Sequence, residues 1–452
     1  MENKHENHEN REQWGSRLGF ILAAAGSAIG LGNIWRFPTV VGQSGGGAFI
    51  FLYLLIIFVI GIPLMIGELT IGRRGKRNIV GAFQKIKPGG PWWFIGALGV
   101  LAGFVILSFY SVIAGWGIAY MFKFLTGQLT GLEPGQSADI FGALASSPVE
   151  PLIWHAIFMA MTIGIVIFGI DKGIERASKI MMPILFVLLF VLAIRSVTLD
   201  GAMEGVLWYI TPDFSAINIQ TILGALGQVF FSLSLGMGAI MTYGSYLPDE
   251  ENIPSAAMFI SLADIGIAIL AGFIIIPAVF AFGLEPNAGP ALIFITLPAV
   301  FGSMPFGNLV GALFFLLLTI AALTSAISLL EVPVAYFIDE LKWNRLKASV
   351  IVGIVIFLLG IPSSLSQGLL SNNLFFGMEF LDFMDFFSSN LLLPIGGLLT
   401  AIFIGWVWGT RNTVDEIQKK GVHFGLRSPW GIIVQFVLPI VLLYILITGL
   451  IG

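Results

Sequence analysis

The stretch Gly26-Ser-Ala-Ile-Gly-Leu-Gly-Asn-Ile-Trp-Arg-Phe-Pro38 decides the fold, because it lies inside a long apolar segment and yet is a poor helix. Each glycine costs about 1 kcal/mol relative to alanine in a helix interior. Asn33 and Arg36 stand where a lipid-facing helix would carry Leu or Val, and a charge at the bilayer centre costs at least ~2.5 kcal/mol. Irregular backbone at that depth lines a cavity, where its free amides and carbonyls become ligands. The stretch predicts half of a binding site in a transporter, although Gly26-xxx-Gly30 alone is also a helix-packing motif.

The composition is typical of an integral membrane protein. Of its 452 residues 57% are hydrophobic and only 11% are charged, whereas soluble proteins carry about 25% charged residues. Cysteine is absent, which excludes disulfides and thiol catalysis. The chain has no Walker-type phosphate loop and no plausible catalytic constellation, so it is predicted not to be an enzyme.

Eleven apolar segments are long enough to cross a bilayer as helices, each of which needs about 20 residues. Strands of a β-barrel would be half that length and alternating, so the chain is predicted to be an all-α polytopic membrane protein with eleven transmembrane helices. The predicted spans are 18–42, 47–71, 93–125, 152–170, 174–196, 218–246, 254–283, 306–338, 348–366, 375–408 and 430–451.

The distribution of Lys and Arg predicts the orientation of these spans. With the amino terminus inside, 19 of the 22 basic residues fall in the predicted cytoplasmic segments 1–17, 72–92, 171–179, 247–253, 339–347 and 409–429. The exceptions are Arg36, Lys123 and Arg195. The amino terminus is therefore predicted to be cytoplasmic and the carboxyl terminus extracellular. The segment 285–305, rich in Pro and Gly, is predicted to be an outer loop with short helices that acts as a lid.

The sixth span contains a second poor helix, Gln228-Val-Phe-Phe-Ser-Leu-Ser-Leu-Gly-Met-Gly238. Polar side chains again precede a close pair of glycines. Interrupted segments five spans apart are the pattern of inverted repeats, whose binding site lies at the midplane between them. Ser232 and Ser234 could instead bond back to their own helix.

Two further spans carry candidate cation ligands. Asp264 lies in an apolar seventh span, and a buried carboxylate that stays ionised needs Na⁺ or a proton; alternatively it lies near the cytoplasmic end and is hydrated. Thr324 and Ser325 on the eighth span offer the oxygen ligands that hard cations prefer. The embedded acids Glu68 and Glu331 are predicted to be structural hydrogen-bond anchors.

At Gly30-Leu-Gly-Asn-Ile-Trp-Arg-Phe-Pro38, at the second poor helix and at Leu323-Thr-Ser325, the chain resembles the neurotransmitter:sodium symporters nearly end to end, especially their bacterial members. The resemblance implies the leucine-transporter-type fold, a 5+5 inverted repeat with broken helices 1 and 6. It divides the chain into a cytoplasmic tail 1–17, a first repeat 18–196, a second repeat 197–408, and a cytoplasmic loop with span 11 at 409–452.

The resemblance also implies a set of site residues. The substrate would contact Ala28, Leu31, Gly32, Ile106, Tyr110, Phe231, Ser232, Ser234, Met237, Gly238, Ala326 and Leu329. A first Na⁺ would be held by Ala28, Asn33, Ser232, Asp264 and the substrate carboxylate, and a second by Gly26, Ile29, Ala321, Thr324 and Ser325. The outer gate would be Arg36 with Asp385, the inner gate Arg11 with Asp339, supported by Trp14 and Tyr246. Gly173 and Pro183 would form a hinge in the fifth span.

Three departures from the family pattern carry expectations of their own. Asp264 replaces an Asn ligand of the first sodium, and Ala268 replaces the Ser of chloride-dependent relatives. A fixed charge at Asp264 would substitute for chloride, so chloride independence is predicted. Met237 replaces a bulkier Phe, and because Met is adaptable, large apolar side chains such as Trp and Tyr are expected to fit as well as Leu.

These features predict a sodium-coupled symporter that imports hydrophobic L-amino acids by alternating access, with two Na⁺ per substrate. Its expected partners are that amino acid and the lipid bilayer, with no nucleic acid and no obligate protein partner. The expected location is a plasma (inner) membrane of bacterial type. The alternatives are a membrane amino-acid sensor that does not transport and a proton-coupled carrier that uses Asp264.

Overall fold

The computed structural model describes residues 12–132, 135–284 and 292–451, and every regular element in these ranges is helical. The α-helices are α1 (Arg17–Ala28), α2 (Phe37–Gln43), α3 (Gly47–Ile56), α4 (Ile62–Gly75), α5 (Ile79–Ile86), α6 (Trp93–Leu125), α7 (Gln136–Ser146), α8 (Glu150–Val166), α9 (Arg176–Val197), α10 (Ala202–Ile210), α11 (Ile219–Ser232), α12 (Ala239–Gly244), α13 (Ile253–Ala281), α14 (Leu297–Ser303), α15 (Gly307–Leu341), α16 (Arg345–Ser364), α17 (Phe380–Phe386), α18 (Leu393–Ile402), α19 (Thr410–Ile417), α20 (Arg427–Ile432) and α21 (Leu438–Ile451). Shorter π-helical or 3₁₀ turns are η1 (Gly32–Arg36), η2 (Ile57–Gly61), η3 (Ile170–Glu175), η4 (Phe214–Ala216), η5 (Leu292–Thr296), η6 (Phe387–Leu392), η7 (Phe403–Gly409), η8 (Lys419–Gly421) and η9 (Ile433–Val437).

The first predicted span is broken where the sequence indicates. Helix α1 ends at Ala28, Ile29 is extended, and the chain resumes helical geometry at η1. The two halves, 17–28 and 32–43, are bent by 50°. A Cβ on Gly30 would lie 2.4 Å from the Ser325 hydroxyl and 2.6 Å from the Tyr110 hydroxyl, so glycine permits the close approach of α15 and α6 to this break.

The sixth predicted span is broken as well. Helix α11 ends at Ser232 and α12 begins at Ala239, with residues 233–238 between them not helical. Ser234, Gly236 and Gly238 have φ values of +54°, +77° and +81°, a region that glycine enters without steric cost. The expectation of two interrupted helices is confirmed.

All eleven predicted spans coincide with helices, with shifted ends. By length and composition, eight helices in the described ranges could cross a membrane, or ten if each bent pair counts as one span. The remaining predicted span is the α11–α12 pair, whose halves are individually too short. The tenth span was placed too early, because a turn with Gly377 at φ +84° precedes α17. Its helical run also extends past 408 to Ile417, inside the predicted loop 409–429.

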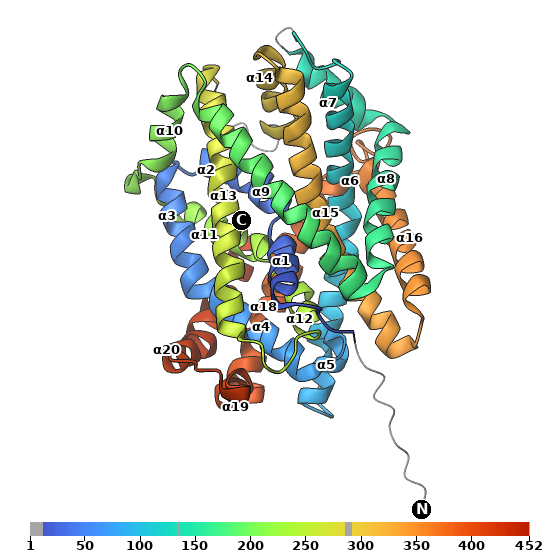
Figure 1. Ribbon diagram of the computed structural model, residues 1–452, viewed down its shortest axis with the longest axis vertical. Coiled ribbons are helices and arrows are strands. Elements are labelled where there is room, and N and C mark those ends of the chain that lie inside the picture. Colours follow the sequence, from blue (N-terminus) through green and yellow to red (C-terminus); the bar gives the residue numbers. More distant parts are fainter. Residues whose placement is uncertain (1–11, 133–134, 285–291, 452) are drawn as a thin grey trace, which may run out of the picture.

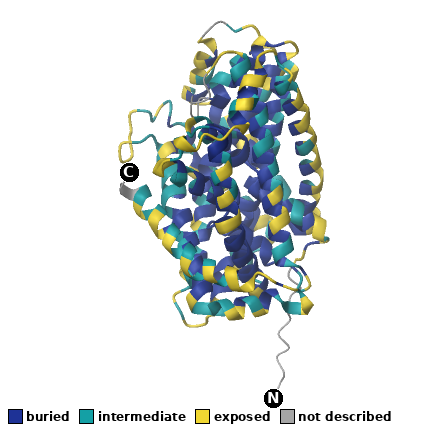
Figure 2. Ribbon diagram, turned by 90° about the vertical axis from the view of Figure 1, so that its left-hand side faces the viewer, coloured by how far each residue is buried: buried dark blue, intermediate teal, exposed yellow. Residues whose placement is uncertain are grey.

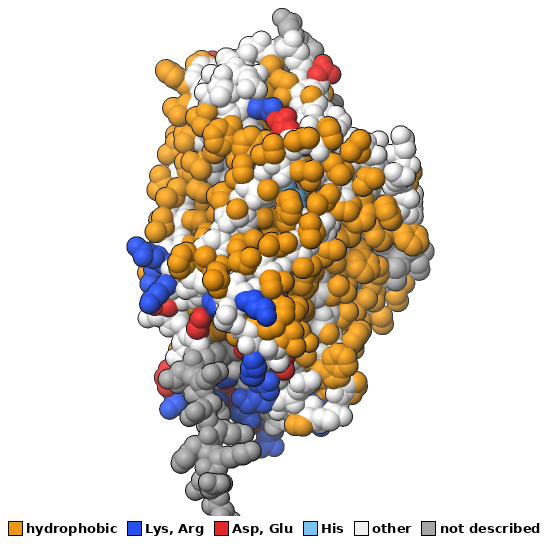
Figure 3. All heavy atoms as spheres, turned by 90° about the vertical axis from the view of Figure 1, so that its right-hand side faces the viewer, with side chains coloured by type: hydrophobic (Ala, Val, Ile, Leu, Met, Phe, Trp, Pro, Cys, Tyr) orange, Lys and Arg blue, Asp and Glu red, His pale blue; other side chains and the backbone are white. Residues whose placement is uncertain are grey.

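The broken helices lie at the centre of the bundle. Helix α1 contacts α9, α13 and α15, and α12 packs on α4 (Figure 1). Buried residues fill the interior and exposed residues line the outside (Figure 2). Most of one face is hydrophobic, with Lys and Arg gathered toward one end of the molecule (Figure 3). Of the predicted lid, residues 285–291 lie outside the described ranges, and 292–303 form η5 and α14.

Buried side chains hydrogen-bond to the backbone of both breaks. The Glu68 carboxylate on α4 accepts from the Gly236 amide at 2.8 Å, and the Gln228 side-chain amide donates to the Gly32 carbonyl at 2.6 Å. Glu331 accepts from the Tyr246 hydroxyl at 2.6 Å and pairs with Arg345 at 2.7 Å. The prediction that Glu68 and Glu331 are hydrogen-bond anchors is confirmed.

Arg73 joins three segments at the end of the bundle where α4 meets α19. Its guanidinium, at the end of α4, is fully buried and pairs with Glu416 of α19 at 3.3 Å. It also donates to the Glu416 carbonyl and, at 2.8 Å, to the Glu251 carbonyl before α13. One cation therefore fixes α19 and the α12–α13 loop to α4.

Replacing Arg73 with methionine is expected to destabilise the protein by about 3–5 kcal/mol, because two hydrogen bonds from a charged donor to buried carbonyls are lost, each worth about 1.5–3 kcal/mol. The measurement is the thermal unfolding midpoint in detergent. The matched control is Arg74→Met: Arg74 is half exposed and pairs with Glu416 at 3.6 Å, so its loss should cost at most ~1 kcal/mol. Equal shifts for both variants would contradict the assignment.

Candidate functional site

A small central cavity lies between the two breaks. It is lined by Ser27, Ala28, Gly30, Gly32, Ile106, Tyr110, Phe231, Ser234, Met237, Ser325 and Leu329. Its volume is about 20 Å³, roughly enough for one water molecule. A side chain larger than that enters only if the surrounding residues move, and Met237 is among the most adaptable of them.

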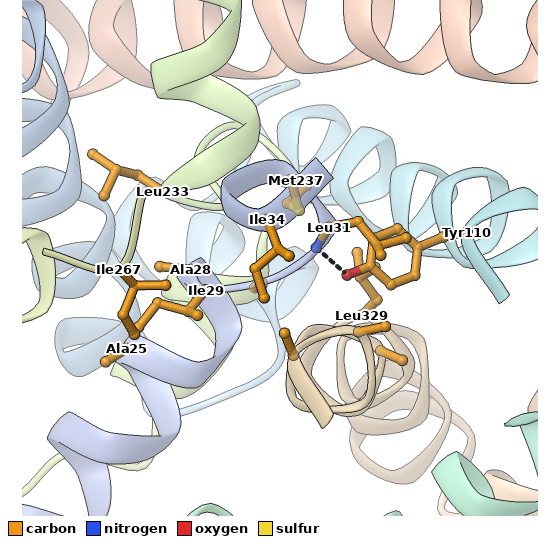
Figure 4. Packing of buried hydrophobic residues seen from close by; sticks show 14 of the residues in the cluster. Ala25, Ala28, Ile29, Leu31, Ile34, Tyr110, Leu233, Met237, Ile267 and Leu329 are labelled. Carbon is orange, nitrogen blue, oxygen red and sulfur yellow. Dashed lines mark hydrogen bonds between the residues drawn. The ribbon is translucent and has the colours of Figure 1, made fainter. Parts of the chain in front are cut away.

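Two backbone amides of the first break, those of Leu31 and Gly32, lie beside this cavity. The Leu31 amide donates to the Tyr110 hydroxyl at 3.1 Å, and Figure 4 shows this contact with Leu329 of α15 nearby. The Gly32 amide belongs to the same turn, because Gly32 begins η1. A Cβ on Gly32 would meet the Phe231 ring at 2.9 Å. The amide end of a broken helix favours an anion such as a carboxylate.

Asp264 of α13 lies at the centre of a fully buried polar cluster. Its Oδ1 accepts from the Ser232 hydroxyl at 2.6 Å and from the Asn33 amide at 2.7 Å. Its Oδ2 accepts from the Tyr53 hydroxyl at 2.8 Å. All three donors are neutral, so no cation among the described residues pairs with this carboxylate. A bound cation would compensate its charge.

A second oxygen cluster links α15 to the break in the first span. The Thr324 hydroxyl donates to the Ile29 carbonyl at 3.2 Å and to the Ala321 carbonyl at 2.9 Å. The Ser325 hydroxyl lies 3.0 Å from the Ser27 carbonyl and 3.4 Å from the Gly26 carbonyl. Carbonyl and hydroxyl oxygens without an acid suit a monovalent hard cation.

A larger cavity of about 420 Å³ lies beyond Tyr110 and Phe231, toward the α7 and η5 end. Both aromatic side chains line both cavities and so separate them. Arg36 and Asp385 line the larger cavity, but among the described residues no ion pair joins them. Arg36 instead lies 5.2 Å from the centre of the Phe231 ring, and Asp385 accepts from the Ser389 hydroxyl at 3.1 Å.

The segment before α1 packs against α12 and the residues that follow it. The Trp14 indole donates to the Tyr243 carbonyl at 3.0 Å and packs edge-on against Tyr246. Asp339 accepts from the Asn78 amide at 2.5 Å. Arg11, its predicted partner, lies outside the described residues.

The predicted hinge residues occupy irregular positions in the fifth span. Gly173 lies in the π-helical turn η3, and Pro183 lies inside α9. A Cβ on Gly173 would lie 2.4 Å from the Ile165 carbonyl oxygen. The span therefore begins with a turn that differs from α-helical geometry.

Most of the predicted substrate contacts converge, and four lie off the central cavity. Leu31 lines the larger cavity, Ser232 faces Asp264, Gly238 packs on Ile79, and Ala326 is buried without lining either cavity. Sequence reasoning missed Tyr53 and Ser27. Ser27 donates to the Ser328 hydroxyl at 2.7 Å, and its place inside the first motif is the signal that would have found it.

Comparisons with known proteins agree with this geometry. The model of the sodium:neurotransmitter symporter family matches residues 11–137 and 150–452. The chain is 44% identical to the uncharacterized sodium-dependent transporter YhdH of Bacillus subtilis, over 97% of this chain and 98% of that protein. It is 27% identical to the sodium- and chloride-dependent GABA transporter ine of Drosophila melanogaster, over 93% of this chain and 49% of that one.

A solved structure is similar over nearly the whole chain. The crystal structure of MhsT in complex with L-phenylalanine superposes with a TM-score of 0.90 at 49% identity. The match covers 97% of this chain and all of that one.

Proposed function

Because the chain belongs to the sodium:neurotransmitter symporter family, and so is a sodium-dependent, multi-pass membrane symporter rather than an enzyme, we propose that it imports hydrophobic L-amino acids with two sodium ions. The observation that carries this proposal is the arrangement of the first break. On one side its backbone faces the apolar cavity of Ile106, Met237 and Leu329. On the other side it bonds to the Thr324 and Ser325 hydroxyls, and Asn33 just beyond it bonds to Asp264.

This shared backbone supplies the coupling. A substrate carboxylate at the Leu31 and Gly32 amides would lie near the Asp264 cluster and complete the shell of the first ion. Each ligand then raises the affinity for the other by the same factor. Two charges moved across 100 mV supply roughly 4–5 kcal/mol, enough for about a thousandfold accumulation at ~1.4 kcal/mol per tenfold.

Two finer features of the proposal rest on particular residues. The fixed charge of Asp264 takes the place of chloride, so transport is chloride-independent. The substrate class is aromatic and branched side chains, because the cavity walls are apolar and Met237 can change rotamer. The complex of the 49% identical MhsT with L-phenylalanine supports this class.

The conformational part of the proposal is alternating access between two inverted repeats, 18–196 and 197–408. Tyr110 and Phe231 form the outer lid, and Arg36 approaches Asp385 when the lid closes. The segment containing Trp14, with Tyr246 and Asp339, closes the inner side. Gly173 and Pro183 allow the fifth span to unwind toward the Thr324 cluster.

The test is uptake of labelled Trp and Leu into proteoliposomes under an imposed sodium gradient, in chloride and in gluconate. The proposal expects sodium-driven accumulation that is equal in both anions. Binding without accumulation would instead identify a sensor. Uptake that follows a proton gradient, with sodium equal on both sides, would make Asp264 a proton carrier and overturn the two-sodium assignment.

Replacing Met237 with phenylalanine is expected to weaken Trp transport about tenfold relative to Leu. Overpacking a filled site costs about 1–3 kcal/mol, and the rigid ring removes the adaptable wall. The measurement is inhibition of labelled Leu uptake by unlabelled Trp and Leu. Met203→Phe on α10, where the side chain is 61% exposed, is the control and should leave selectivity unchanged. An unaltered Trp to Leu ratio in Met237→Phe would refute the assignment.

A further inference from the structure

A cluster of cations lies at the end of the bundle where α4 and α5 meet the α19 region. We define the basic cluster as Arg74, Lys76, Arg77, Lys85 and Lys419. The Lys85 ammonium donates to the Gly75 carbonyl at 3.0 Å, which places it beside Arg74 and Lys76 in the chain. Arg74 and Lys419 reach the same carboxylate, that of Glu416, at 3.6 and 3.0 Å. The five cations are therefore neighbours in space.

The acids paired with this cluster do not balance its charge. Glu416 pairs with Arg74 and Lys419 but also with the buried Arg73. Asp249 is shared by Lys76 and Lys419, and Glu340 pairs with Arg77. The Glu251 carboxylate also interacts with Arg73 and pairs with Arg17, so four carboxylates face seven cations. Lys85 has a carbonyl but no carboxylate partner among the described residues.

The electrostatics of Lys85 follow from this placement. Partial burial lowers the pKa of the Lys85 ammonium, and the charges of Arg74, Arg77, Lys76 and Lys419 lower it further. Such repulsion is relieved by an anion that reaches several of these side chains at once. Arg74 is 53% exposed and Arg77 is 42% exposed, so an anion can approach from outside the bundle.

The position of the cluster selects the kind of anion. Helix α5 packs on the start of α6, where Trp93 and Phe94 are about half exposed. Exposed Trp at the end of an apolar span marks the headgroup level of a bilayer. Trp92 anchors this corner by packing on Phe403 at 5.7 Å between ring centres. The cluster therefore lies beside the lipid headgroups of the leaflet at this end of the bundle, rather than in open solvent.

We propose that the basic cluster binds the phosphate of an anionic phospholipid headgroup, with Lys85, Arg74 and Arg77 as its principal contacts. The bound lipid compensates the excess charge and stabilises the junction of α4, α5 and the α19 region. This inference is independent of the transported substrate. It adds a lipid site on a surface that the two central cavities do not reach.

The test uses the purified full-length protein in neutral detergent, with the thermal midpoint as the readout. Dioleoyl phosphatidylglycerol is expected to raise the midpoint, and dioleoyl phosphatidylcholine is not. Each Lys or Arg near a surface contributes about 1 kcal/mol to the binding of anionic lipid, which is about fivefold in affinity. In the double variant Lys85→Gln with Arg74→Gln, the phosphatidylglycerol concentration that gives half of the midpoint shift is therefore expected to rise at least about tenfold.

The control is Lys347→Gln, because Lys347 is exposed, packs on Trp343 and forms no ion pair with the acids of the cluster among the described residues; it should keep the full lipid response. If the double variant fails to fold, the single variant Lys85→Gln takes its place in the test, because the Lys85 side chain is exposed. Equal responses to both lipids, or an unchanged response in the cluster variants, would overturn the proposal. An equal response to inorganic phosphate would show a soluble anion site instead. None of these readouts depends on transport, so they stand apart from the uptake test.

Discussion

Replacing Asp264 with alanine is expected to lower sodium-driven uptake at least about 100-fold. The carboxylate is fully buried and is the shared acceptor of Asn33, Ser232 and Tyr53. Each contact to a charged group contributes about 1.5–3 kcal/mol, so the loss of two or more corresponds to a factor of 100 or more in binding. The measurement is initial uptake of labelled Trp at fixed sodium gradient, normalised to protein in the membrane.

Asp264→Asn separates charge from shape. This variant keeps the side-chain volume and loses only the fixed charge, so chloride is expected to restore part of its uptake while the wild type is indifferent to chloride. Asp200→Asn, an exposed acid outside both cavities, is the control. A wild type stimulated by chloride, or an Asn variant with full activity in gluconate, would contradict the proposed role of the charge.

The breaks in the first and sixth spans could be predicted because glycine destabilises a helix interior and polar residues inside an apolar run are unfavourable in contact with lipid. Asp264 could be predicted for the same reason. Tyr53 could not, since a single Tyr in the apolar run 47–71 indicates nothing by itself. Its role appears only through its contact with Asp264, 211 positions away in the chain.

Charge placement shows a different limit of sequence reasoning. Counting Lys and Arg treated Arg73 as one of six basic residues in a cytoplasmic segment, whereas the structure buries it completely beside Glu416. The exception Lys123 has a physical explanation, because it pairs with Glu150 at 3.1 Å. Both pairings join residues distant in sequence, so no local pattern predicts them. The inverted-repeat boundaries and the membrane sidedness of the termini stay predictions.

The second large effect is expected at the Thr324 cluster. Thr324→Val keeps the shape of the side chain and removes the hydroxyl that reaches the Ile29 and Ala321 carbonyls. A hydrogen bond or ligand contact to a charged group contributes about 1.5–3 kcal/mol. The sodium concentration for half-maximal Trp binding is therefore expected to rise about tenfold or more, and further when Ser325→Ala is added.

Thr319 supplies the matched control for that measurement, because it lies on the same helix, is equally buried, and donates only to the Phe315 carbonyl of its own helix at 2.8 Å. Thr319→Val should leave the sodium dependence unchanged. The Thr324 variant should also lose steepness in its sodium titration, since one of two ions no longer contributes, while Trp affinity at saturating sodium stays within a few-fold of the wild type. A sodium titration identical for the Thr324 and Thr319 variants would mean that the hydroxyl only holds α15 against α1. The second ion would then have to bind elsewhere.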